Sequence, residues 1–137
     1  LDVAIQVREG RSLQDILDNN DYLYLRKIEE QVLLSEDIAG KVVATGGSAV
    51  YSAAGMERLK QSATIIFLDV PLPALRQRIG NFATRGIARK PNQSLESLFD
   101  ERCTLYRQYA DINIDCDQQS LEQTLKSVVQ QLLAYRG

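Results

Sequence analysis

Short apolar runs alternate with amphipathic stretches along the chain, and this alternation predicts strands separated by helices. Residues 42–45 are apolar or β-branched, and residues 64–69 form a second such run that Asp69 closes. Residues 112–115, Ile-Asn-Ile-Asp, form a brief third run. Runs of this length and composition are typical of strands that are buried on both faces of a parallel sheet.

Helical patterns occupy most of the chain between these runs. Apolar residues recur there every three or four positions, as they do on one face of a helix. Ser12, Asp21 and Ser94 stand where helices are expected to begin, and Ser120 opens the capping box Ser-Leu-Glu-Gln. The last helix is predicted to be buried through its apolar stripe, which consists of Leu121, Leu125, Val128, Val129 and Leu132.

Strands that alternate with helices predict an α/β fold with a parallel sheet, here as a single domain over residues 1–137. Ligands of such sheets bind beyond the carboxyl ends of the strands. The residues that fall at or near such ends are Asp2, Gly46, Gly47, Ser48 and Asp69. The pattern therefore predicts a small α/β protein with a site for an anionic ligand.

The run at residues 42–45 ends in Gly46 and Gly47, and a helical pattern follows. Two glycines allow a tight turn and let the backbone approach a ligand, because no Cβ atom intervenes. A simple strand-to-helix connection is the alternative interpretation of the same pair.

Composition narrows the possible chemistry. A net charge of −2 gives no reason to expect a nucleic acid or an anionic membrane as a partner. The chain contains no histidine, which excludes Ser-His and Cys-His nucleophiles and histidine-based metal sites. The remaining carboxylates, arginines, lysines and backbone amides suit charge neutralisation and phosphoryl transfer. The two isolated cysteines suit a reducing cytosol, so we expect a cytoplasmic protein.

An irregular basic stretch at residues 80–93 is longer than a connector needs. It contains Arg85, Arg89 and Lys90. We interpret it as a lid loop that closes over an anion.

Four segments, taken in order, resemble the shikimate kinase family, which belongs to the P-loop, nucleoside-monophosphate-kinase-like group. They are Asp-Val-Ala-Ile-Gln-Val-Arg-Glu-Gly-Arg-Ser-Leu at residues 2–13, Leu-Arg-Lys-Ile-Glu-Glu at 25–30, Thr-Gly-Gly-Ser-Ala-Val at 45–50 and Glu-Arg-Cys-Thr-Leu-Tyr at 101–106. The resemblance covers nearly the whole chain. It implies a three-layer α/β/α fold and ATP-dependent, magnesium-assisted phosphorylation of the shikimate 3-hydroxyl in aromatic amino acid biosynthesis.

The resemblance also implies roles for individual residues on the acceptor side. Arg26 and Arg102 would bind the shikimate carboxylate, with Glu29 holding Arg26 in place. Asp2 would accept hydrogen bonds from substrate hydroxyls and serve as the base. The backbone amides of the turn would face the substrate, from Gly46, Gly47 and Ser48.

On the nucleotide side, the resemblance implies that Arg85 neutralises the transferring phosphoryl group and that Arg78 lies against the adenine. It implies a small-molecule substrate, and we expect a monomer.

The chain departs from the family pattern at three places. Ser48 replaces a third glycine, and Arg85-Gly86-Ile87 replaces the usual lid sequence. The phosphate loop Gly-x-x-Gly-x-Gly-Lys-[Ser/Thr], which binds ATP phosphates and magnesium, does not occur in the 137 residues, so we assign no metal ligand in this chain. We expect roughly 30 further N-terminal residues in the natural protein, the length of such a strand–loop–helix unit. We also expect this chain as given to be inactive.

Two other interpretations stay open at this point. One is a related small-molecule kinase with another carboxylate-bearing acceptor. The other is a non-catalytic binding module derived from such a kinase.

Overall fold

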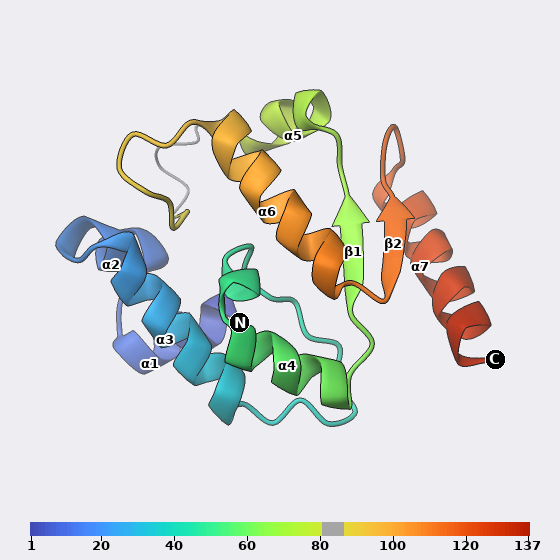
Figure 1. The fold of residues 1–137 in the computed structure, drawn as a ribbon, viewed down its shortest axis with the longest axis horizontal. Helices are drawn as coiled ribbons and strands as arrows, with labels where there is room; N and C mark the ends of the chain where they lie inside the picture. Colours follow the sequence, from blue (N-terminus) through green and yellow to red (C-terminus); the bar gives the residue numbers. More distant parts are fainter. Residues whose placement is uncertain (81–86) are drawn as a thin grey trace.

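The computed structural model describes residues 1–80 and 87–137 (Figure 1). The described residues form seven α-helices, one short 3₁₀ helix and a two-stranded sheet. In chain order these are α1 (Asp2–Glu9), α2 (Leu13–Asn19), α3 (Tyr22–Ser35), η1 (Ala49–Tyr51), α4 (Ala53–Ser62), β1 (Ile66–Asp69), α5 (Leu72–Ile79), α6 (Leu95–Tyr109), β2 (Ile112–Asp115) and α7 (Leu121–Arg136).

The sheet is parallel, with Ile66 opposite Ile112 and Asp69 opposite Asp115. The chain passes from β1 through α5 and α6 before it returns in β2. Helix α6 packs on one side of the sheet, where the ring centroids of Phe67 and Tyr106 are 5.1 Å apart. Helix α7 packs beside β2 on the other side (Figure 1). The α/β/α prediction is therefore confirmed.

The predicted strand at residues 42–45 is wrong, because this segment has no regular secondary structure. Val42, the residue expected to be buried there, is fully exposed. A strand needs a neighbour that pairs with its backbone, and among the described residues β1 pairs only with β2. A β-branched run without a pairing partner remains an extended connection.

The predicted helix starts are confirmed by their cap hydrogen bonds. The Ser12 side chain accepts from the backbone N–H of residue 15 at 3.1 Å, and the Asp21 carboxylate accepts from that of residue 24 at 2.9 Å. Ser94 caps α6 in the same way, and Ser120 forms both hydrogen bonds of its capping box. These caps satisfy N–H groups that the first turn of a helix leaves unpaired.

The prediction that α7 is buried along its whole apolar stripe is wrong. Only Val128 and Leu132 pack against the buried residues of β2. Leu121, Leu125 and Val129 are exposed, with Leu121 at 90%. The two-stranded sheet is too narrow to cover the rest of the stripe.

Helix α3 lies at the centre of the remaining core and positions the site. One side of it packs against α1 and α2 through Leu25, Ile28 and Val32, and Leu33 packs near α4 with Met56. This packing fixes the helix from which the polar side chains of the candidate site project. None of the helices in the described ranges is both long and apolar enough to span a membrane.

Candidate active site

Four elements that are distant in sequence meet around the turn at residues 46–48. Helix α1 begins there with Asp2, α3 contributes Arg26 and Glu29, and α6 contributes Arg102. The short helix η1, directly after the turn, contacts both α3 and α6. The structure thus brings together every predicted acceptor-side residue.

The two glycines of the turn allow a close approach of side chains from three helices. A Cβ atom on Gly46 would lie 2.6 Å from Glu29 Oε1 and 3.0 Å from Asp2 Oδ1. One on Gly47 would lie 2.6 Å from Arg102 Nη1 and 3.0 Å from the Tyr106 hydroxyl. Gly46 and Gly47 are therefore needed for the packing of the site as well as for the turn.

Ser48 takes the place of a third glycine without strain. Its φ of −87° and ψ of −6° lie in the right-handed region, so this position does not need the positive φ that favours glycine. Its hydroxyl donates a hydrogen bond to the carboxylate of the buried Glu29. The substitution thus supplies Glu29 with a hydrogen-bond donor that glycine lacks.

The two arginines present hydrogen-bond donors with no partner among residues 1–80 and 87–137. These are Nε and Nη2 of Arg26 and Nε of Arg102, and all three atoms are buried. Arg102 is anchored at another atom, because its Nη2 donates to the carbonyl of Ala88 at 2.6 Å. Buried guanidinium N–H groups are costly when unpaired, so this arrangement is typical of a site built for an anion.

Burial dominates the electrostatics of Glu29, which is only 3% exposed. Desolvation raises the pKa of its carboxyl, and the nearby Asp2 carboxylate raises it further. The Ser48 hydrogen bond and the cations of Arg102 and Arg26 lower it, but they do not offset the burial.

This pKa shift predicts a pH-dependent stability. Because the folded-state pKa of Glu29 lies above its unfolded value near 4.5, its contribution to stability is fully present below that pH and is lost as the pH rises through the folded pKa. Glu29→Gln should remove this loss, so its unfolding free energy should fall less than that of the unsubstituted protein between pH 4.5 and 7.5. Urea unfolding at several pH values measures this, with the exposed Glu57→Gln as control. Parallel curves for Glu29→Gln and the unsubstituted protein would contradict the assignment.

Three further residues of the site were not predicted from the sequence. Tyr106, which belongs to the motif at residues 101–106 but was given no role there, donates its hydroxyl hydrogen to the Gly47 carbonyl at 2.6 Å. Burial raises the pKa of Tyr106, which favours the protonated, donating form. Tyr51 donates to Glu101 at 2.5 Å and lies beside both arginines. No sequence motif included Tyr51. Glu101 belonged to the motif at residues 101–106, but no role was assigned to it.

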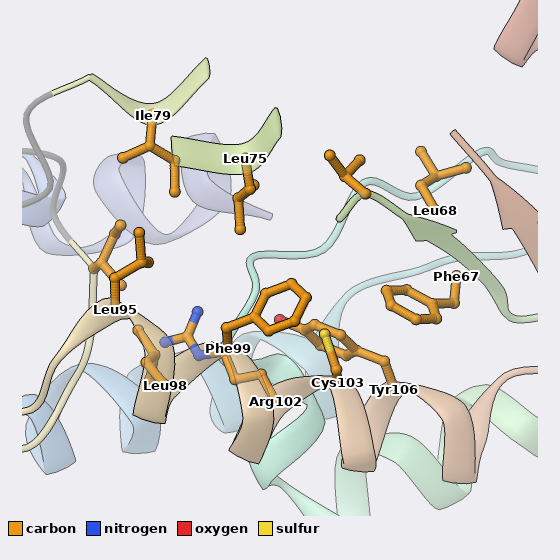
Figure 2. A pocket seen from close by; sticks show the side chains of 12 residues that line it. Phe67, Leu68, Leu75, Ile79, Leu95, Leu98, Phe99, Arg102, Cys103 and Tyr106 are labelled. Atoms are coloured by element: carbon orange, nitrogen blue, oxygen red, sulfur yellow. The ribbon is translucent and has the colours of Figure 1, made fainter. Parts of the chain in front are cut away.

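An apolar pocket of about 220 Å³ adjoins Arg102 and Tyr106 (Figure 2). Side chains from α5, α6 and β1 face one another across it. Its lining consists of Phe67, Leu68, Val70, Leu75, Ile79, Ile87, Leu95, Leu98, Phe99, Arg102, Cys103 and Tyr106. Burial raises the pKa of the Cys103 thiol, as expected for a packed cysteine.

Of the two predicted nucleotide-side residues, the structure describes only Arg78. Arg78 is exposed on α5. Residues 81–86 of the predicted lid, Arg85 among them, lie outside the described residues. The described part of the lid is tied to α6, because Lys90 and Gln93 both contact Glu101. In the described ranges no three His, Cys, Asp or Glu side chains gather as a metal would require.

Comparison with solved structures defines the class of protein. The shikimate kinase from Acinetobacter baumannii in complex with shikimate matches with a TM-score of 0.83 and 27% identity over 97% of this chain and 76% of its own. The shikimate kinase from Aquifex aeolicus vf5 matches with a TM-score of 0.77 and 28% identity, and the match covers 97% of this chain and 79% of that one. The chain therefore has the α/β fold of the nucleoside-monophosphate-kinase-like P-loop proteins.

Sequence relatives identify the family within this class. The family described as shikimate kinase matches residues 1–133. The shikimate kinase of Chromobacterium violaceum is 34% identical over 137 residues, which span 96% of this chain and 73% of the relative. The shikimate kinase of Sulfurihydrogenibium sp. is 28% identical over 130 residues, which span 94% of this chain and 78% of the relative. The chain belongs to the shikimate kinase family.

Proposed function

We propose that this site binds shikimate and that the protein catalyses ATP-dependent phosphorylation of its 3-hydroxyl in aromatic amino acid biosynthesis. The observation that supports it best is the pair of arginines with buried, unpartnered N–H groups. A carboxylate is the anion that matches planar guanidinium donors through paired, charge-assisted hydrogen bonds.

In this proposal Arg26 and Arg102 bind the substrate carboxylate from two helices. Glu29 lies one turn from Arg26 on α3, and its carboxyl interacts electrostatically with both guanidinium groups. It would orient them before the substrate arrives. The Arg102 hydrogen bond to Ala88 would fix the second arginine from the lid side.

The hydroxyl end of the substrate would face Asp2 and the glycine turn. Asp2 is exposed, and its carboxylate approaches Gly46, so it is accessible to a ligand at the turn. It would accept hydrogen bonds from substrate hydroxyls and take the proton of the reacting one. The backbone N–H groups of Gly46, Gly47 and Ser48 would add donors.

ATP with Mg²⁺ is the phosphoryl donor that the family implies. The described residues do not themselves fit the metal, because they contain no cluster of suitable ligands, and the sequence contains no Gly-x-x-Gly-x-Gly-Lys motif. We therefore propose only that Arg78 contacts the adenine and that Arg85 neutralises the transferring phosphoryl group. Monomeric state and cytoplasmic location remain predictions.

An acceptor panel tests the proposal. Calorimetric titrations would compare shikimate with two matched ligands, a carboxylate-free polyol of similar size and a hydroxyl-free cyclohexene carboxylate. Shikimate should bind at least roughly tenfold tighter than either, because only it engages the arginines and the turn together. Equal affinity for all three would overturn the proposed function.

A further inference from the structure

We infer that Tyr51 is a positioning residue for the carboxylate site: its ring supports the Arg26 guanidinium, and Glu101 fixes the ring. The inference rests on the proposed function, because it assigns Tyr51 an effect on the substrate carboxylate.

The guanidinium carbon of Arg26 lies over the ring of Tyr51. Arg26 Cζ lies 3.5 Å from the centroid of the Tyr51 ring and 4.9 Å from that of Tyr22, one turn earlier on α3. Arg102 Cζ lies 5.7 Å from the same Tyr51 ring. Cations within about 6 Å of a ring centroid are attracted to the ring face.

The contact with the ring leaves guanidinium donors of Arg26 without a hydrogen bond. The five N–H donors of an arginine lie in its plane and point outward from its edge. Nε and Nη2 of Arg26 are buried and have no partner in the described part of the chain. Tyr51 thus holds the cation without using the donors that a carboxylate needs.

The hydroxyl of Tyr51 is held by a network that reaches two other segments. It donates to Glu101 Oε1 at 2.5 Å, and Glu101 Oε2 accepts from Gln93 Nε2 at 3.2 Å. Lys90 Nζ lies 3.6 Å from Glu101 Oε2. The Tyr51 hydrogen bond lowers the pKa of Glu101, so a protonated phenol faces an ionised carboxylate.

The environment of Tyr51 differs from that of a core residue. It is half-buried and belongs to none of the three apolar clusters. It ends a 3₁₀ helix of only three residues, too short to fix a large side chain by itself. The orientation of its ring therefore depends on Arg26 and Glu101.

The test compares shikimate with its methyl ester, which keeps the ring and hydroxyls but carries no charge. In NMR titrations, Tyr51→Leu should weaken shikimate binding roughly tenfold, the value of a buried cation–ring contact, and should change methyl ester binding less than twofold. Tyr51→Phe keeps the ring and loses the Glu101 hydrogen bond, so it should rescue most of the affinity, leaving a loss of roughly threefold. Tyr135→Leu, on the exposed end of α7, is the matched control and should bind both ligands unchanged.

The possible outcomes separate this inference from the proposed function. Unchanged shikimate affinity in Tyr51→Leu, or equal losses for both ligands, would overturn the inference while the proposed function stands. Should Tyr51→Leu fail to fold, Tyr51→Phe decides the question, since unchanged shikimate affinity in that variant contradicts the Glu101 anchor. A failure of the proposed function appears differently, as an unsubstituted protein that does not prefer shikimate over its ester.

Discussion

Arg102→Ala is expected to weaken shikimate binding on the order of 100-fold, the largest effect of any single substitution in the site. The variant removes a charged partner of the carboxylate, and it also removes the hydrogen bond to Ala88 that ties α6 to the lid segment. Calorimetric titration measures the loss.

Arg107→Ala is the matched control, because Arg107 lies on the same helix but is exposed and pairs with Asp69 at 3.3 Å. Its shikimate affinity should equal that of the unsubstituted protein. An Arg102→Ala variant that binds as tightly as Arg107→Ala would contradict the assignment of Arg102 to the carboxylate.

Gly47→Ala is expected to cause a roughly tenfold loss of shikimate affinity, as large as that of Tyr51→Leu, with little change in melting temperature. The added methyl would meet Arg102 Nη1 at 2.6 Å. A guanidinium at the end of a flexible side chain can move away, so the fold tolerates the methyl, but the carboxylate loses a positioned donor. A misplacement of about 1 Å is sufficient for losses of this size.

Gly46→Ala, one residue earlier, provides the contrast. Its methyl would meet Oε1 of the buried Glu29 at 2.6 Å, and this carboxyl is held by Ser48. We expect destabilisation of about 1–3 kcal/mol, typical of overpacking, in thermal unfolding. If Gly47→Ala instead lost stability and kept its affinity, the placement of Arg102 against the turn would be wrong.

Helix starts and the α/β class could be predicted from the sequence because their signals are local. A cap such as Ser12 or Ser94 bonds to an N–H three residues away, so a few neighbouring letters contain the information. The strand predicted at residues 42–45 failed because pairing depends on a distant segment. The prediction that the apolar stripe of α7 is buried failed for a related reason, because the sequence of the helix does not contain the width of the sheet on which it packs.

The site also contains some residues that could be predicted from the sequence and others that could not. The glycine turn was predicted from the pattern of strands and helices. Arg26 and Arg102 were found only through ordered motifs that resemble a family, because periodicity alone did not place them beside the turn. Tyr51 and Glu101 could not be found, because they are 50 positions apart and only packing joins their side chains. The role of Ser48 likewise depends on a residue distant in sequence, because its hydroxyl donates to the carboxylate of Glu29.

The most direct test of the account compares shikimate with its methyl ester in titrations of the unsubstituted protein. The two ligands share the ring and the hydroxyls and differ at the carboxyl group, which is a charged carboxylate in shikimate and a neutral methyl ester in the other. The buried N–H groups of Arg26 and Arg102 are proposed to bind the charged form. We expect shikimate to bind at least roughly 30-fold tighter, the lower range for a buried, hydrogen-bonded charge pair. Equal affinities would contradict the proposal that the two arginines form a carboxylate site.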